Sequence, residues 1–314
     1  MRGSSGRAPG LRALVRGAAG AALASAIVVP LMRRRLRAPA AVTTAAAAAG
    51  PLALAVLRPR TRGRDAAMYA LQMWAFTMVH ELPFDDPEAL RRRLRIDYTI
   101  RVDRMLGAGE LPNVRLQRAL ARPGRVGALD RFLSAVHWAW FMEPHLALLW
   151  ILVRDVDRFP SAARQMAAVY DIGCAGYFAL PTAPPWWASE QGRTGAPVRR
   201  IMVEVGEETW GRAWPRMYSL AGGNPWAAMP SLHLASSVMA ALLLAESGRV
   251  PGAVGWAYAA TLGVALVHLG EHYVTDLLAG LAVVAAARRG EPIAEPFATR
   301  ISALAQRLEA IANG

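Results

Sequence analysis

Two histidines and an aspartate are the residues whose types and spacing could do chemistry. His272 and Asp276 are four residues apart, so on a helix they would share one face. The carboxylate could then accept the Nδ1 proton of His272, which fixes the tautomer and leaves Nε2 as a nucleophile towards phosphorus. His233, at the start of another apolar segment, could donate the proton that an alkoxide leaving group needs. The three side chains predict one reaction centre if they converge.

The same residues allow other interpretations. A single histidine at a helix end is usually structural, and spacing alone does not decide between the two roles. His233 and His272, with either Asp276 or Glu271, could instead form a three-ligand zinc site. Ser231 is expected to cap the helix that His233 opens, and the free N–H groups of that helix end would favour a nearby phosphate.

Membrane helices are the elements expected to position these residues. The chain has 314 residues, 54% of them hydrophobic, and its charges are segregated between long apolar runs. Such runs must be helical, because lipid offers no hydrogen-bond partners to an open backbone. The apolar segments cover residues 17–32, 41–57, 66–83, 132–153, 161–181, 230–246, 251–268 and 272–287. Because Pro30 and Pro51 weaken the first two, we expect an all-α polytopic membrane bundle with six core transmembrane helices plus one or two N-terminal hydrophobic segments.

The chain is expected to divide into three parts. Residues 1–64 hold the N-terminal hydrophobic segments with basic flanks, and residues 65–290 hold the main bundle with long external connections at 84–131 and 182–229. Residues 291–314 place apolar side chains at spacings of three and four, which predicts an amphipathic C-terminal helix.

The charge pattern indicates a membrane partner and argues against nucleic acid. The net charge of +13 comes from arginine alone, since the sequence contains no lysine. The arginines lie at the ends of apolar segments, where they anchor helices and meet lipid headgroups. The positive-inside rule places the histidines on the opposite, extracytoplasmic face of a multi-pass protein of the cell membrane. The single Cys174 is expected to be a small packing residue, so no intrachain disulfide can form.

Further polar side chains in apolar segments are candidates for a pocket that receives a polar acceptor. His137 and His145 are eight residues apart in segment 132–153 and would lie roughly on one face, with Glu143 directed elsewhere. Tyr177 lies on the segment that leads to the second long connection. Mutual hydrogen bonding inside the bundle is the alternative for all four.

Three short pieces of the sequence resemble a known family. They are MPSLH at 229–233, GEHYVTDLLAG at 270–280 and LPTAPPWW at 180–187. They are similar to the type-2 phosphatidic acid phosphatase superfamily, and most of all to its branch with inositol phosphorylceramide synthases. This resemblance implies a six-helix core, an external active site and a phosphohistidine intermediate formed without a metal or other cofactor. It also implies that His272 is the nucleophile, Asp276 its partner and His233 the general acid.

The sequence departs from the family pattern where phosphate is held. The lysine-to-Arg-Pro motif is absent, and Ala265-Leu266 replace the Ser-Arg that precedes the family's histidine. Other groups must then bind the phosphate oxygens, and guanidinium does so bidentately. Besides Ser231 with the helix end that it caps, four side chains are candidates: Arg193, Arg199, Arg200 and, four residues before His272, His268.

Together these features predict an integral membrane lipid phosphatase or phosphotransferase. Its substrate would be a lipid-linked phosphate or phosphodiester, and water or a lipid or sugar alcohol would accept the phosphoryl group. A protein that binds or moves a lipid phosphate without cleaving it is the alternative from another class, as is a metal-dependent membrane hydrolase.

Overall fold

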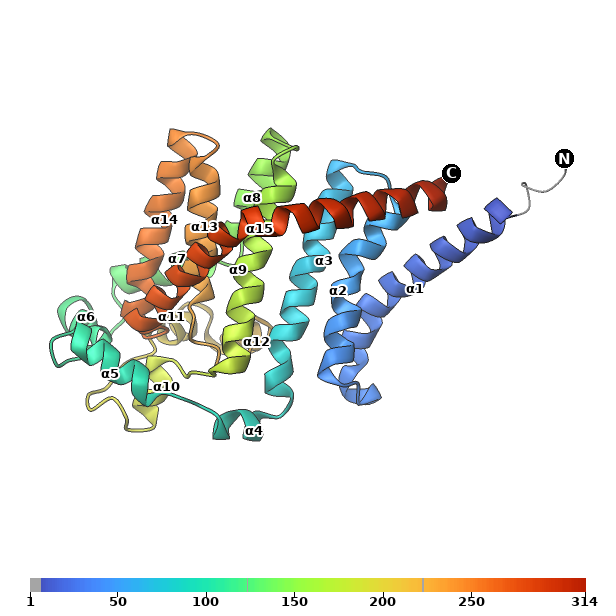
Figure 1. Ribbon diagram of the computed structural model, residues 1–314. Coiled ribbons are helices and arrows are strands. Elements are labelled where there is room, and N and C mark those ends of the chain that lie inside the picture. The colour runs from blue at the N-terminus through green and yellow to red at the C-terminus, as the bar shows by residue number, and fades with distance from the viewer. Residues whose placement is uncertain (1–6, 123, 222) are drawn as a thin grey trace, which may run out of the picture. The chain divides into compact units, whose positions relative to one another are not determined.

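The computed structural model describes residues 7–122, 124–221 and 223–314, and these residues form helices joined by short connections (Figure 1). Within them β-structure is limited to two isolated bridges, Arg122 with Arg125 and Thr182 with Ala227. The chain divides into two compact units, residues 1–85, 149–167 and 289–314, and residues 86–148 and 168–288. The predicted all-α fold is confirmed.

The first unit is built on three N-terminal helices, α1 (Arg7–Leu36), α2 (Ala40–Leu57) and α3 (Arg62–Glu81), followed by the short turn η1 (Leu82–Asp85). α2 packs against both α1 and α3. Pro30 and Pro51 lie inside continuous helices, so they do not interrupt these segments. This differs from our expectation, and transmembrane helices do tolerate an internal proline.

The second unit contains the long connections and the apolar helices that face them. Its elements are α4 (Pro87–Arg92), α5 (Asp97–Leu106), α6 (Pro112–Leu120), α7 (Ala128–Ala139), α10 (Pro185–Glu190), α11 (Ile201–Trp210), η2 (Gly211–Ala213), α12 (Trp214–Ala221), α13 (Leu232–Ala245) and α14 (Arg249–His268). Three further helices belong partly to each unit: α8 (Glu143–Arg154), α9 (Phe159–Ala179) and α15 (Val274–Asn313). The connection 84–131 is largely helical, and Ile100, Leu111 and Val114 from it are buried.

Close helix packing organises the second unit. α13 lies against α14, because Gly252 and Gly255 would place a Cβ only 2.7–2.8 Å from the Cα atoms of Ala245 and Ala241. Any larger side chain at these two positions would push the helices apart. Cys174 is buried and unpaired, as the sequence predicts.

The apolar helices make this a membrane protein. By length and composition, three described helices could cross a membrane, Gly10–Leu36 within α1, Ala40–Leu57 and Arg249–His268, or four if the bent pair α7–α8 is one span. The other segments that we expected to span, in α3, α9, α13 and α15, are helical in the described chain but do not meet these criteria; α13 has only 14 residues.

The expected single helix over 132–153 is wrong. The chain breaks between α7 and α8, and the two helices are inclined by 50°. Pro144 explains the break: it has no N–H to continue the first helix, and its fixed φ suits the first turn of a new one. The eight-residue spacing of His137 and His145 therefore no longer places them on one face.

The C-terminal segment is not a separate element. The apolar segment 272–287 continues without interruption into residues 291–313 as α15, with Pro292 and Pro296 inside the helix. Phe297, Ile301 and Leu304 are exposed along it. This amphipathic stripe is available to lipid.

Candidate active site

The start of α13 is held in place by glycines and by backbone hydrogen bonds. Ser231 caps the helix, as predicted, with its Oγ accepting a hydrogen bond from the N–H of Leu234 at 3.4 Å. Its own N–H donates to the carbonyl of Asp276 at 2.9 Å. A Cβ at Gly280 would lie 2.6 Å from the Ser231 carbonyl, so α15 can approach this point only because residue 280 has no side chain. These contacts place His233 beside the beginning of α15.

The turn between α14 and α15 presents His272. α14 ends at His268, Gly270 has a φ of +80°, and α15 begins at Val274. A Cβ at Gly270 would also lie 2.5 Å from the Arg199 carbonyl, so glycine is required there for both conformation and space. His272 therefore precedes the helix that contains Asp276, whereas we expected both on one helical face.

Two helices of the connection 84–131 support this turn from outside. The carboxylate of Asp103, on α5, accepts hydrogen bonds from the N–H groups of Val274 and Thr275 at 2.9 and 2.8 Å and from the Thr275 hydroxyl at 2.5 Å. Asp103 is fully buried and caps α15 from a distant part of the chain. On α6, Asn113 donates to the carbonyl of His272 at 3.0 Å.

The next turn of α6 makes an equivalent set of bonds. The amide of Gln117 donates to the carbonyls of Arg199 and His268, both at 2.8 Å, and accepts from the N–H of Arg199 at 2.9 Å. Asp103, Asn113 and Gln117 were not among the residues predicted from the sequence. The only signal was the four-residue spacing of Asn113 and Gln117, which shows a shared face but not what that face contacts.

The two histidines and the aspartate converge. Nδ1 of His272 lies 3.2 Å from Oδ2 of Asp276, and Nε2 of His272 lies 3.1 Å from Nδ1 of His233. The same Asp276 oxygen accepts a hydrogen bond from the N–H of Tyr273 at 2.9 Å. His272 and Asp276 are almost fully buried, at 3% and 0% exposure, while His233 is partly exposed.

These contacts determine which ring nitrogens of the two histidines carry a proton when Asp276 is ionised. When an ionised Asp276 accepts the Nδ1 proton of His272, the Nε2 lone pair of that ring points at the N–H of His233. The arrangement thus joins the carboxylate of Asp276 and the rings of His272 and His233 by two successive hydrogen-bond contacts.

Aromatic side chains fix the ring of His233. His137 stacks on it with ring centroids 5.0 Å apart, and Trp140 lies 4.1 Å from it on a tilted plane. The Trp140 indole is itself held, since its N–H donates to Ser236 Oγ at 2.8 Å. Of the four pocket candidates, the structure therefore brings His137 to the site.

The other pocket candidates lie elsewhere in the packing. The Tyr177 hydroxyl donates to the carbonyl of Pro230 at 2.9 Å, so it supports the chain before Ser231. Glu143 lies beside Ser237, one turn further along α13 than His233. His145 follows the break after α7 and is half-buried on α8.

The four candidates for phosphate binding have different partners. Arg193 forms an ion pair with Asp97 at 2.5 Å, and Arg199 is held by Glu204 and by two carbonyls. Arg200 pairs with Glu271 at 3.1 Å, and its guanidinium lies 3.7 Å from the centre of the Trp186 ring. His268 is fully buried against Asp130, with Nε2 and Oδ1 2.7 Å apart. Of these, Arg200 is the one whose partner directly precedes His272.

The zinc arrangement that the sequence allowed is not formed by the described residues. No group of three histidine, cysteine, aspartate or glutamate side chains in that part of the chain has the arrangement of a metal site. The contacts between His233, His272 and Asp276 are hydrogen-bond contacts along a line.

Comparison with known proteins gives one match. A family model described as the PAP2 superfamily matches residues 101–289, more than half of the chain, and this range contains Asp103, His233, His272 and Asp276. No curated protein and no solved structure matches the chain.

Proposed function

Because the chain belongs to the PAP2 superfamily, which suggests a phosphatase or phosphotransferase with lipid phosphate substrates, we propose that it is an integral membrane enzyme that works through a phosphohistidine at His272. The observation that carries the proposal is the 3.1 Å contact between Nε2 of His272 and Nδ1 of His233, with Asp276 on the far side of the nucleophile.

In the first step Nε2 of His272 attacks the phosphorus atom of the substrate. The P–N bond forms as the bond from phosphorus to the leaving oxygen breaks, and His233 gives its Nδ1 proton to that oxygen. Asp276 stabilises the positive charge that develops on the imidazole of His272. The substrate replaces the direct hydrogen bond between the histidines, so both rings are already oriented towards the reacting group.

In the second step the phosphoryl group moves to an acceptor. His233, now neutral, takes a proton from water or from an alcohol, whose oxygen attacks phosphorus as the P–N bond breaks. Water gives a phosphatase and an alcohol gives a phosphotransferase. The resemblance of LPTAPPWW, MPSLH and GEHYVTDLLAG to inositol phosphorylceramide synthases favours a phosphodiester donor with a lipid or sugar alcohol as acceptor.

Arg200 is our choice for the group that binds the phosphate oxygens. Its guanidinium is held against the flat face of Trp186 and paired with Glu271, the residue before His272. The carboxylates that pair with Arg193 and Arg199 belong to Asp97 and Glu204, which do not adjoin His272 in the sequence. The N-terminus of α13, capped by Ser231, adds a partial positive charge on the same side.

We place the site on the extracytoplasmic face of the cell membrane. The support is the arginine distribution: Arg58, Arg60, Arg249, Arg288 and Arg289 flank the ends of apolar segments opposite to the histidines.

The leaving group provides the sharpest test of His233. An alkyl phosphate needs a proton on its departing oxygen, whereas an aryl phosphate with an acidic phenol does not. We expect His233→Gln to lower turnover of an alkyl phosphate by about 10²–10⁴-fold and turnover of the aryl phosphate far less. Turnover in detergent or nanodiscs measures both, with His80→Gln, on α3, as the matched histidine control. Equal losses on the two substrates would contradict the acid role.

The products decide between acceptors. Purified protein is incubated with a mixed lipid extract, and mass spectrometry follows free phosphate and transferred headgroups. Transferred headgroup supports the phosphotransferase branch, and free phosphate alone supports the phosphatase. Neither product under any condition would favour the non-catalytic alternative, a protein that binds or moves lipid phosphate.

A further inference from the structure

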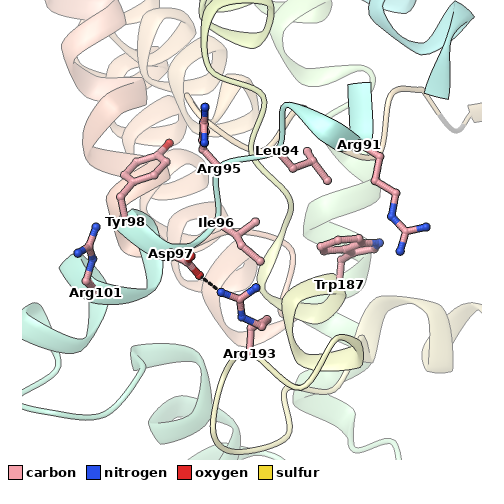
Figure 2. A pocket seen from close by; sticks show the side chains of 9 residues that line it. All are labelled: Arg91, Leu94, Arg95, Ile96, Asp97, Tyr98, Arg101, Trp187 and Arg193. Carbon is pink, nitrogen blue, oxygen red and sulfur yellow. Dashed lines mark hydrogen bonds and ion pairs between the residues drawn. The ribbon is translucent and has the colours of Figure 1, made fainter. Parts of the chain in front are cut away.

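A pocket of about 420 Å³ lies in the second unit, and neither His233 nor His272 is among the residues that line it (Figure 2). It is formed by the end of α4, the turn into α5, the first part of α5, and α10 with the loop after it. Four of its lining side chains are arginines: Arg91, Arg95, Arg101 and Arg193. Pockets of this size accept small ligands.

The pocket has an excess of positive charge. Asp97 is its single acidic lining residue, and that carboxylate is already paired with Arg193 at 2.5 Å. Among the described residues, the side chains of Arg91, Arg95 and Arg101 form no hydrogen bond or ion pair. Arg199, by contrast, is paired with Glu204 and donates to two backbone carbonyls. Three of the arginines that line the pocket therefore have no counter-charge among its lining residues.

The aromatic walls of the pocket are held by neighbours. The Tyr98 hydroxyl lies 2.9 Å from Thr182 Oγ1 and 3.1 Å from the sulfur of Met229. Burial raises the pKa of Tyr98 to about 12, so the phenol stays neutral and adds no negative charge. Trp187 meets Trp226 edge-on at 6.2 Å and is close to Arg91 in Figure 2. An indole face beside arginines suits a sugar or polyol ring that bears an anionic group.

We propose that this pocket binds a phosphate-bearing headgroup, separately from the phosphoryl group that reacts at His272. Guanidinium groups bind phosphate oxygens bidentately, and three of them without partners match a phosphate monoester or diester better than a single carboxylate. The headgroup can belong to an anionic phospholipid of the bilayer or to a soluble phosphorylated polyol. Tyr98 connects the pocket to Met229, two residues before Ser231 at the start of α13.

The experiment measures binding to the full-length His272→Ala variant in phosphatidylcholine nanodiscs, where no turnover can occur. One arm titrates glycerophosphate by calorimetry at low and high salt. The other replaces part of the phosphatidylcholine by phosphatidylglycerol and follows retained lipid by native mass spectrometry. The variant Arg95→Gln/Arg101→Gln should weaken binding of at least one probe by about tenfold or more.

Two further variants make the result specific. Arg212→Gln/Arg249→Gln removes the same charge from exposed positions outside the pocket and should bind as the parent does. Asp97→Asn releases Arg193 and removes the one carboxylate, so binding should become tighter by about threefold or more. A gain of this kind cannot come from a folding defect.

The outcomes distinguish a soluble ligand from a lipid headgroup, and binding in this pocket from reaction at His272. Loss of glycerophosphate binding in the double variant assigns a soluble ligand, and loss of retained phosphatidylglycerol alone assigns a lipid headgroup. Binding of both probes that is unchanged in Arg95→Gln/Arg101→Gln, or no binding of either probe to the parent, would overturn the proposal. Because no turnover enters the readout, a failure here leaves the role of His272 untouched.

Discussion

The chain contains two buried histidine–aspartate pairs close together in sequence, and they differ in what the second ring nitrogen faces. In the first, His272 lies 3.2 Å from Asp276, and its other nitrogen meets His233 at 3.1 Å. In the second, His268 lies 2.7 Å from Asp130, and its other nitrogen is buried with no hydrogen-bond partner in the described chain. A carboxylate partner and burial are common to both, so neither identifies a nucleophile. What distinguishes His272 is that its other nitrogen faces the partly exposed His233, the proton donor of our proposal.

The carboxylates of the two pairs also have different tasks. The second oxygen of Asp130 accepts a hydrogen bond from the N–H of Gly127 at 2.7 Å and so caps α7. Through His268, that cap is joined to the end of α14. The second oxygen of Asp276 has no hydrogen-bond partner among the described residues, although Asp276 is fully buried. We infer that the Asp130 pair stabilises the packing of two helices and that the Asp276 pair serves the reaction.

The largest contrast is expected between His272→Asn and His268→Gln. Each new amide can reproduce the donor that faces its aspartate, but asparagine 272 has no second nitrogen for attack. His272→Asn should lower turnover by about 10⁴-fold or more, with little change in thermal stability. His268→Gln should retain both properties. Turnover per folded molecule and the unfolding temperature in detergent measure the two effects.

A truncation completes this comparison. His268→Ala leaves the buried Asp130 without its partner and should lower the free energy of unfolding by about 3–5 kcal/mol. The turnover of molecules that remain folded should be close to that of the wild type. If His268→Ala instead removed activity without loss of stability, the distinction between the two pairs would be wrong.

The aspartates should separate in the same way. In Asp276→Asn the neutral amide cannot stabilise the positive charge that develops on His272, and we expect turnover to fall by about 10³–10⁴-fold. The side-chain oxygen of asparagine can still accept from the N–H of Tyr273, so the fold should be kept. Asp130→Asn should lower the unfolding temperature and leave turnover per folded molecule unchanged. Comparable kinetic losses in both variants would contradict the assignment.

The sequence predicts the fold class and the three residues His233, His272 and Asp276 better than it predicts the residues that hold them in place. Apolar run lengths are a property of single segments, so the helices of an all-α membrane protein follow from them. The meeting of His233 with His272 follows from two segments that start at one face. The break before α8 could also have been predicted, because Pro144 favours the start of a new helix.

What the sequence could not provide are contacts between distant segments. Asp130 is 138 residues from His268, and Asp103 is 171 residues from the Val274 N–H that it accepts. Local periodicity reports which face of a helix is apolar and does not report which helix it meets. For the same reason His268, four residues before His272, was expected to assist with phosphate, whereas in the structure His268 contacts the distant Asp130.

Asp103 offers a smaller and more graded test. Asp103→Ala removes the acceptor for the first N–H groups of α15 and should lower the free energy of unfolding by about 1–2 kcal/mol. The same loss should loosen His272 relative to His233 and reduce turnover by about tenfold. Asp103→Asn keeps one acceptor oxygen and should recover most of this loss. Asp86→Ala removes the cap of α4, which does not present the histidines, and should leave turnover unchanged.

The last contrast is between two glycines of α15. At Gly280 an added Cβ would lie 2.6 Å from the carbonyl of Ser231, whereas at Gly290 no atom lies within 4 Å. Gly280→Ala should therefore move α15 away from the start of α13, at a cost of about 1–3 kcal/mol in stability. Gly290→Ala should be neutral or stabilising by up to about 1 kcal/mol, since alanine is the better helix former.

The kinetic result of this pair bears on the contact between the two histidines. Ser231 is two residues before His233, and Asp276 is one helical turn before Gly280. A displacement at their point of closest approach must lengthen the path from Asp276 through His272 to His233. Turnover of an alkyl phosphate, which needs the proton from His233, should then fall more in Gly280→Ala than turnover of an activated aryl phosphate. An equal fall on both substrates would show that the close approach maintains only the fold, and that the contact between the histidines tolerates a shift of the helices.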